Sequence, residues 1–160
     1  MRRYHMNKAE REIADPAVME EILARGKYAV IALSRDDLPY IVTLSYGYDA
    51  GRKALYFHTA HRGVKLDYLR ANPSVCATVI EDHGYIMGEC AHSYRSVVLY
   101  GQLVHVDGLE EKKHGMDVML RHLEDDPDAV KKRSLKDDQA YARAAILRLD
   151  IEEMTGKAGR

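Results

Sequence analysis

The stretch LYFHTAHRGVKLDYLRANP, from Leu55 to Pro73, carries the pattern on which the fold assignment depends. A run of large apolar residues opens it, as expected of a buried strand over 54–59. A glycine-containing turn follows, and then a segment that can form a short helix over 63–71. Asn72 and Pro73 end this helix, because the residue before a proline disfavours helical backbone. The stretch therefore predicts a strand, a turn and a helix in close succession.

The turn of this stretch carries groups that suit a phosphate. The N-terminus of a helix presents backbone N–H groups without partners and a partial positive charge. The Thr59 hydroxyl, Arg62 and Lys65 lie near a helix that starts close to Val64, so the turn is a candidate phosphate site. The alternative is an ordinary strand-to-helix turn with a solvated lysine, since the spacing matches neither a Walker loop nor a GxGxxG motif.

Outside this stretch, alternating and β-branched runs predict five further strands, and Gly101 marks a bend or bulge in the longest of them. The six predicted strands span 28–34, 40–48, 54–59, 74–81, 94–106 and 144–152. Helices are predicted at 16–26, where Asp15 is the N-cap, at 63–71 and at 109–124. Because strands and helices do not alternate regularly, the pattern favours a mainly β fold, a six-stranded antiparallel split β-barrel with flanking helices.

Length and composition indicate a single domain over residues 1–160, with loose tails expected at 1–12 and 155–160. The 24 basic and 25 acidic side chains nearly balance, which argues against nucleic acid or an anionic membrane as a partner. No run approaches the ~20 apolar residues of a membrane span, and residues 1–12 lack the apolar segment of a signal peptide. Cys76 and Cys90 form no CxxC pair, so we expect reduced thiols and a cytoplasmic location.

Four ordered segments carry a family resemblance: LPYIVTLSYGY, YFHTAHRGVKLDYLRANP, SYRSVVLYGQLVHVD and EEKKHGMDVMLRHL. Together they resemble the pyridoxamine 5'-phosphate oxidase-like FMN-binding split barrels, and more closely the branch related to 5-nitroimidazole antibiotic resistance proteins. The resemblance covers nearly the whole chain. It implies FMN as the cofactor and a homodimer in which the two chains build two equivalent sites.

The resemblance also implies which residues bind the cofactor. Lys65, Thr59 and the backbone around Val64 would hold the FMN phosphate, with His58 beside the flavin. Thr43, Leu44, Ser45 and Tyr46 would border the isoalloxazine ring, and Arg62 would lie in the phosphate turn. Tyr94, Arg95 and Ser96 would contact the cofactor from the long strand, across the dimer interface. The chain departs from the family pattern at Thr43, where a proline is expected, and at Ser45, where an asparagine is expected.

His58 is the candidate catalytic residue, because a neutral imidazole beside a flavin could orient a substrate or move a proton. The alternative is a strand-end histidine bonded to backbone. The other seven histidines form no tight metal signature such as HExxH, so no metal is expected. We interpret Tyr48, Tyr100 and the methionines near Met116 as packing residues.

The leading hypothesis is an FMN-dependent oxidoreductase that reduces a small molecule, with nitroaromatic compounds of the 5-nitroimidazole type as the named possibility. Oxidation of pyridoxamine 5'-phosphate is less favoured, because no second basic cluster for a substrate phosphate is evident. An alternative hypothesis from another functional class is a protein that binds flavin or haem without catalysing a reaction, since the histidines offer axial ligands for haem. A dimeric barrel with an empty cleft is the remaining alternative.

Overall fold

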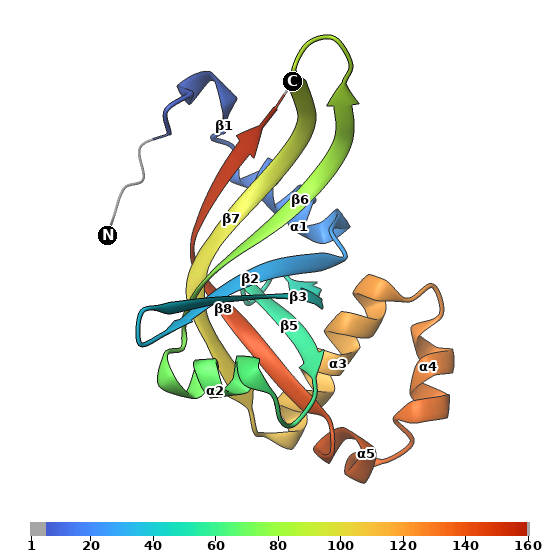
Figure 1. The fold of residues 1–160 in the computed structure, drawn as a ribbon. Coiled ribbons are helices and arrows are strands. Elements are labelled where there is room, and N and C mark those ends of the chain that lie inside the picture. Colours follow the sequence, from blue (N-terminus) through green and yellow to red (C-terminus); the bar gives the residue numbers. More distant parts are fainter. Residues whose placement is uncertain (1–5, 160) are drawn as a thin grey trace.

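A computed structural model describes residues 6–159 and shows one antiparallel sheet with helices packed on it (Figure 1). The strand order is β3-β2-β6-β7-β8-β5-β4, and β1 pairs with β8 beyond the end of β5. The strands are β1 (Glu12–Ile13), β2 (Tyr28–Arg35), β3 (Leu38–Ser45), β4 (Gly47–Asp49), β5 (Ala54–Thr59), β6 (Ser74–Ile86), β7 (Ala91–Val106) and β8 (Ala145–Ala158). The helices are a 3-10 turn η1 (Ala9–Arg11), α1 (Pro16–Arg25), α2 (Val64–Ala71), α3 (Leu109–Leu123), α4 (Pro127–Ser134) and α5 (Asp138–Ala142).

Strands β3 and β4 are two halves of one extended segment that meet at Tyr46. The first half pairs with β2 along its whole length, whereas the second half pairs with β5. The segment therefore joins the two ends of the sheet and closes it into a barrel. Strand β4 pairs only with residues 54–56 of β5. No described strand lies between residues 57–59 of β5 and the free edge of β3. This gap in the strand pairing is the split of the barrel.

Two apolar clusters hold the barrel together. Inside it, alternate residues of the strands pack against α1 and α2, with Ile31, Phe57 and Leu99 fully buried. Outside it, α3 packs on the outer face of β5 and β8 through Met119, next to Tyr56 and Ile146. Helix α2 contacts β3 beside the split, where the rings of Tyr68 and Tyr40 lie 5.2 Å apart. The split is thus bounded by β3, by β5 and by α2.

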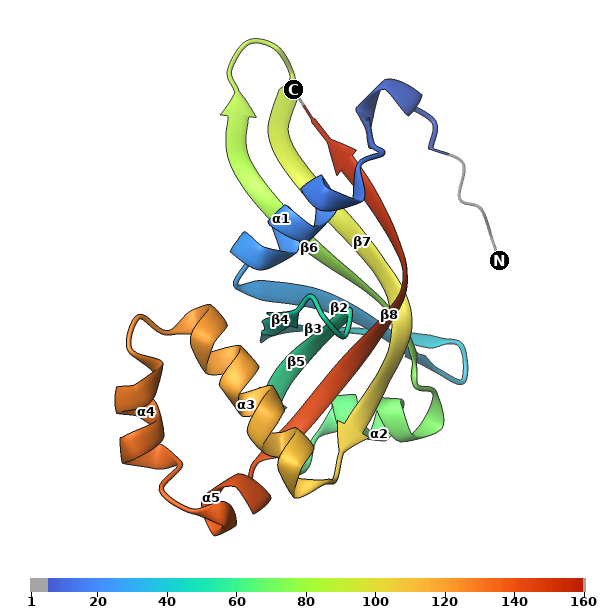
Figure 2. The same cartoon turned by 180° about the vertical axis from the view of Figure 1, so that it is seen from behind.

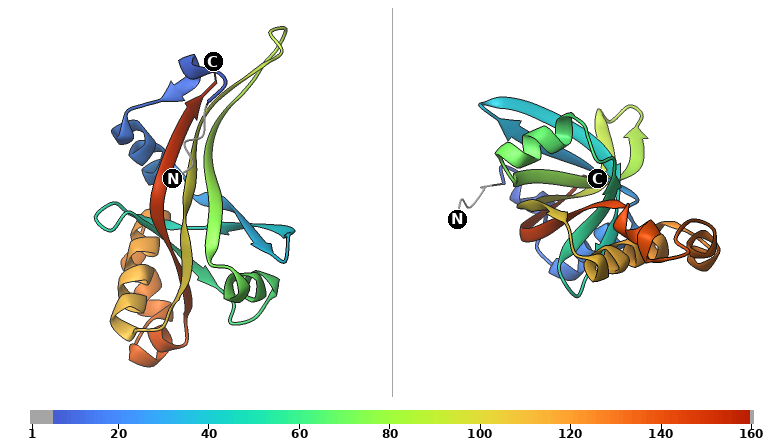
Figure 3. Two further views of the ribbon diagram at one scale, coloured as in Figure 1. Left: turned by 90° about the vertical axis from the view of Figure 1, so that its left-hand side faces the viewer. Right: turned by 90° about the horizontal axis from the view of Figure 1, so that it is seen from below.

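Strands β6 and β7 continue past the barrel as a long hairpin, with β8 beside them (Figure 3). Helix α1 covers one face of this hairpin, as the view from behind shows (Figure 2). No described helix covers the opposite face, which continues over β2 and β3. Three large apolar side chains stand exposed on it, Tyr28, Ile41 and Ile80. We call this surface the open sheet face.

The predicted elements are found with three differences. The six predicted strands are the six long strands, and the sheet gains two short ones, β1 and β4. The hairpin is longer than the predicted strands 74–81 and 94–106, because β6 continues to Ile86 through a bulge between Asp82 and Tyr85 and β7 already begins at Ala91. Helices α4 and α5 occupy the charged segment after α3, where no helix was predicted. Gly101 does lie at a bulge, since pairing with β8 shifts between Tyr100 and Gly101.

The expectation of loose tails is wrong for residues 155–158 and for Glu12, which are paired in the sheet. Residues 155–158 belong to β8 and pair with β7 as far as Arg95. Glu12 and Ile13 form β1 and pair with the same end of β8. Backbone pairing orders these polar segments, although their side chains give no apolar signal. Residues 1–5 and 160 of the expected tails lie outside the described residues.

Candidate functional site

The turn between β5 and α2 holds a buried polar atom without a partner. Thr59 ends β5 and is 9% exposed, and its Oγ1 forms no hydrogen bond with any described group. A buried hydroxyl without a partner costs about 1–3 kcal/mol, and such groups are rare in native proteins. The sequence placed this residue in a phosphate site, and its unmet hydrogen-bonding capacity fits a ligand group at this position.

The N-terminus of α2 is open to a ligand as well. Its N-cap is Gly63, whose φ of +140° lies in a region that favours glycine. Because glycine has no side chain, no side-chain group caps the helix. The first N–H groups of α2 therefore have no capping side chain, and Leu66 supplies the first turn bond, to the Gly63 carbonyl at 2.9 Å. The backbone around Val64 points its partial positive charge out of the turn.

Two cations flank this helix start. Arg62 is exposed and Lys65 is half-buried, and neither forms an ion pair with a carboxylate of residues 6–159. Most cations of helices α1 to α4 are paired instead, as Arg70 is with Asp67 at 2.8 Å. An unpaired lysine and arginine beside an uncapped helix start form a site with anion-binding chemistry.

The free edge of β3 forms the other side of the split. Leu44 turns inward and packs on the core, while Thr43 and Ser45 point to the outside of the barrel. Because β3 is the last strand on its side of the sheet, alternate backbone groups at these residues face the split instead of another strand. The edge of β3 contacts both β5 and α2, so these three segments border the split.

Tyr46 does not face the split. Its side chain is fully buried in the barrel core, and its hydroxyl donates a hydrogen bond of 2.7 Å to the Leu23 carbonyl. Burial raises the pKa of this hydroxyl far above its ordinary value, so it stays protonated. The structure gives Tyr46 a packing role at the point where β3 becomes β4.

His58 lies on the face of β5 opposite to Thr59, and its side chain lines a cavity that is different from the split. This cavity has a volume of about 280 Å³ and lies between β5, α3 and the helices α4 and α5. Three residues of its wall are polar, His58, Ser134 and Arg143. The rest of the wall is apolar and consists of Met116, Val130, Leu135, Ala140 and Ala144. The sequence did not reveal the part of this wall that α4 and α5 supply, because these short, highly charged helices bury no residue.

The residues predicted on the long strand lie far from α2 within one chain. Tyr94 and Leu103 share β7, and their separation corresponds to about 30 Å at ~3.3 Å per residue. Leu103 is the residue that reaches the end of α2, since its N–H donates to the Pro73 carbonyl at 2.8 Å. Tyr94 and Ser96 are therefore not part of the split in the same chain.

Tyr94 and Ser96 instead line a depression of about 400 Å³ on the open sheet face. Its other residues come from both strands of the hairpin: Thr78, Ile80, Asp82 and His92. His92 lies 2.6 Å from Asp82, and this bond holds the Asp82 pKa below its ordinary value. Arg95 points to the opposite face, where Glu81 at 2.7 Å and Glu21 at 3.3 Å bind its guanidinium and raise its pKa.

No group of three or more metal-ligating side chains occurs within residues 6–159. Within the same residues, no helix has the length and apolar character needed to cross a membrane.

Known proteins share both the sequence pattern and the fold. The sequence profile of the family described as Pyridoxamine 5'-phosphate oxidase matches residues 15–158. A candidate 5-nitroimidazole antibiotic resistance protein from Bacteroides thetaiotaomicron has a similar structure with a TM-score of 0.76. The two sequences are 26% identical, and the match covers 92% of this chain and 86% of that one.

Two more distant structures show the same fold. An FAD-binding protein from Mesorhizobium loti matches with a TM-score of 0.66 and 24% identity, over 91% of this chain and 94% of its own. A flavocytochrome from Azotobacter vinelandii matches with a TM-score of 0.80 and 17% identity, over 97% of this chain and 72% of its own. These matches confirm the family resemblance and the split-barrel fold that the sequence indicated.

Proposed function

The chain belongs to the pyridoxamine 5'-phosphate oxidase family, and from this premise we propose that it binds FMN in the split between β3 and β5. The observation that carries the proposal is the unpartnered Oγ1 of Thr59 beside the uncapped start of α2. The FMN phosphate would accept hydrogen bonds from this hydroxyl and from the backbone at Val64. Lys65 and Arg62 would neutralise its charge.

The free edge of β3 would receive the flavin ring. Backbone N–H and C=O groups at Thr43 and Ser45 can bond to the polar edge of an isoalloxazine, which carries both donors and acceptors, whereas those of Leu44 face Ala29 of β2. Such backbone contacts do not require the family's proline or asparagine, so the departures at Thr43 and Ser45 are compatible with binding. The flavin supplies the redox chemistry when it is bound.

A homodimer is part of this proposal. Tyr94 and Ser96 lie on the hairpin, too far along β7 to reach the split of their own chain, so a second copy is needed to bring them to a flavin. The open sheet face, with exposed Tyr28, Ile41 and Ile80, offers an apolar surface for that contact. Arg95 would support the hairpin through Glu81 and Glu21, without touching the cofactor directly.

We propose that the protein is an oxidoreductase acting on a small, mostly apolar electron acceptor, with nitroaromatic compounds as the first class to test. The cavity beside His58 is the substrate candidate, because it offers about 280 Å³ of mainly apolar space on the other face of β5 from Thr59. His58 would orient the acceptor or hold a proton at its imidazole. Unpaired Cys76 and Cys90 are consistent with a reducing, cytoplasmic setting.

The test is the cofactor of the purified protein, identified from the absorption spectrum and from the mass of the released molecule. We expect a flavin spectrum and FMN. A haem band, release of FAD, or failure of the colourless protein to bind added FMN would each contradict the cofactor proposal.

A variant experiment then addresses the phosphate turn. Lys65→Gln should weaken FMN binding about tenfold, as loss of a charge-assisted hydrogen bond does, and should leave riboflavin binding unchanged. Lys132→Gln removes an exposed lysine of α4 and is the matched control. An equal loss for FMN and riboflavin would contradict the assignment of Lys65 to the phosphate. With FMN bound, reduction of a nitroimidazole by NADH or NADPH tests the reaction separately.

A further inference from the structure

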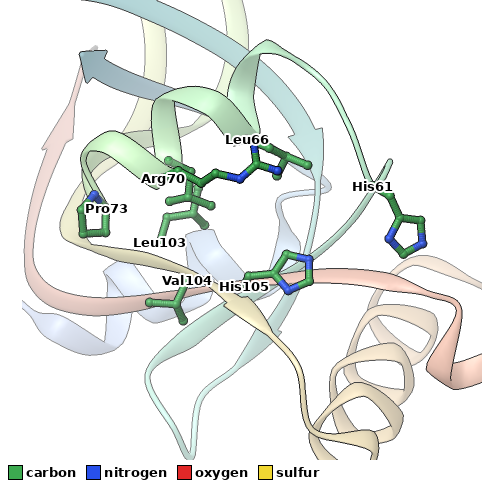
Figure 4. A pocket seen from close by; sticks show the side chains of 8 residues that line it. His61, Leu66, Arg70, Pro73, Leu103, Val104 and His105 are labelled. Atoms are coloured by element: carbon green, nitrogen blue, oxygen red, sulfur yellow. The ribbon is translucent and has the colours of Figure 1, made fainter. Parts of the chain in front are cut away.

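The largest cavity among those described lies between α2 and the end of β7 (Figure 4). It has a volume of about 420 Å³ and is enclosed by α2, the end of β7 and the loop that carries His61. That volume lies within the range of small-molecule sites. Lys65, Arg62 and Thr59 do not line it, so it is separate from the proposed phosphate turn.

The floor of the cavity is apolar. Leu66 and Leu69 of α2 face Leu103 and Val104 of β7 across it, and Pro73 closes one end. Leu66, Leu69 and Leu103 also belong to the barrel core, which fixes their positions. The floor is therefore a preformed surface that suits a planar aromatic or compact aliphatic group.

The mouth of the cavity is basic. The Arg70 guanidinium and the His105 imidazole extend into the same space, with His61 at the far side (Figure 4). No carboxylate lines the cavity. The acidic neighbours lie behind the basic groups: Asp67 bonds to Arg70 at 2.8 Å, and Asp107 bonds to His105 at 3.1 Å.

The hydrogen bonds of the two histidines fix their orientation. The Nε2 of His61 lies 2.6 Å from the Arg143 carbonyl, to which only an N–H can donate. The Nδ1 of His105 faces Asp107. Each ring thus has one nitrogen engaged with the protein and one available, and each available nitrogen can donate to an anion when the ring is protonated.

We propose that this cavity is a second ligand site, which binds a small organic carboxylate with an apolar body. The carboxylate would accept hydrogen bonds from Arg70 and His105 at the mouth, and the apolar body would lie on the leucine floor. This charge complementarity favours an anion over a neutral molecule of the same shape.

The experiment uses 2-naphthoate as the probe and 2-naphthamide as its neutral analogue, with binding measured by calorimetry on the full chain. We expect saturable binding of one naphthoate per chain and binding of the amide that is at least tenfold weaker. Arg70→Gln should weaken naphthoate binding about tenfold. Asp67→Asn should strengthen it, because the guanidinium then loses its competing carboxylate.

The control is Arg25→Gln on α1. Arg25 is an exposed helical arginine that pairs with Glu21 at 3.0 Å, much as Arg70 pairs with Asp67, but it lies away from the cavity. Equal effects of Arg25→Gln and Arg70→Gln would overturn the proposal. So would equal binding of acid and amide, no saturable naphthoate binding, or weaker binding by Asp67→Asn. None of these readouts depends on flavin, so their failure leaves the proposed function untouched.

Discussion

At the scale of single residues, Thr59 links the stability of the protein to its ligand. Its buried Oγ1 lacks a partner in the described chain, so replacing it with a methyl group removes an unfavourable desolvation. We predict that Thr59→Val raises the free energy of unfolding of the flavin-free protein by about 1 kcal/mol and weakens FMN binding about tenfold. Chemical denaturation and FMN titration measure the two effects.

Thr78→Val is the stability control for this prediction. The Thr78 hydroxyl has a partner, since it donates to the Val97 carbonyl at 3.0 Å. The same substitution there should lower the free energy of unfolding by about 1 kcal/mol. If Thr59→Val destabilises the flavin-free protein as much as Thr78→Val does, the Thr59 hydroxyl has a structural partner and the phosphate assignment loses its main support.

His122 is a residue whose protonation opposes folding. Its half-buried ring lies against Tyr46, and its Nε2 is 2.6 Å from the Gly26 carbonyl. Burial lowers the pKa of His122, so as the pH falls below about 6.5 the unfolded chain takes up this proton before the native protein does. Stability is therefore full above that pH and falls as the pH drops toward the native pKa.

We predict that His122→Gln, which keeps a donor near Gly26 but cannot titrate, reduces the loss of melting temperature between pH 7.5 and pH 5.5. Thermal unfolding of both proteins at the two pH values measures this. His83→Gln, at an exposed site on the hairpin, should retain the acid sensitivity of the parent. An acid sensitivity that is the same in His122→Gln and in the parent contradicts the prediction.

At the scale of elements, the bulge at Gly101 determines how β7 meets β8. A methyl group at Gly101 would overlap the Asp150 carbonyl, because the two strands approach closely where their register shifts. We predict that Gly101→Ala lowers the free energy of unfolding by about 3 kcal/mol, as overpacking does. Gly51→Ala, where the nearest atom is the Asp49 carboxylate at 3.5 Å, should change it by less than about 0.5 kcal/mol.

Urea denaturation of the two glycine variants distinguishes a local clash from a general effect. If Gly101→Ala does not fold, circular dichroism shows it directly, and that result agrees with the prediction. Equal stability of the Gly101→Ala and Gly51→Ala proteins would show that the strands can separate at the bulge without cost.

The sequence predicted the elements with a clear hydrophobic pattern, whereas the elements without such a pattern form through tertiary contacts. Alternation and β-branched residues identified all six long strands, and Gly101 identified the bulge. The segment 155–158 was wrongly expected to be loose, because its order comes from backbone pairing with β7 and β1, to which side chains give no sequence signal. Helices α4 and α5 were missed because they bury no residue.

The candidate site shows the same division. Thr59, Arg62, Val64 and Lys65 could be placed from local sequence, since a strand, a turn and a helix start follow one another there. The inward direction of Tyr46 follows the same alternation as Val42 and Leu44, so the strand pattern agrees with its packing role, and only the family resemblance had placed it at the flavin ring. The wall beside His58 comes from Met116 of α3 and from the segment between Val130 and Ala144, all of them far from His58 along the chain.

At the scale of the whole molecule, the open sheet face makes the dimer testable. Ile80 is 51% exposed on this face and takes no part in the described core, so a charge there should leave the fold intact. We predict that Ile80→Asp converts the proposed dimer to a monomer and weakens FMN binding at least tenfold, because each flavin would then lose the contacts of the second hairpin. Light scattering and FMN titration measure both effects.

The matched control for the dimer prediction is Ala129→Asp on the exposed side of α4. It adds the same charge on another surface and should leave both assembly and FMN affinity unchanged. A parent protein that is monomeric while it binds FMN tightly would contradict the two-chain site.

The position of β8 in the sheet affects the order in which the barrel can assemble during translation. β8 is the last of the eight strands in the sequence, yet it lies between β7 and β5. Until residues 145–158 have left the ribosome, β5 and β7 cannot be joined, and the nascent chain holds two partial sheets with exposed edges. Barrel closure is therefore a late event in biogenesis, and ribosome-bound chains that lack β8 are the form most exposed to chaperones and to aggregation.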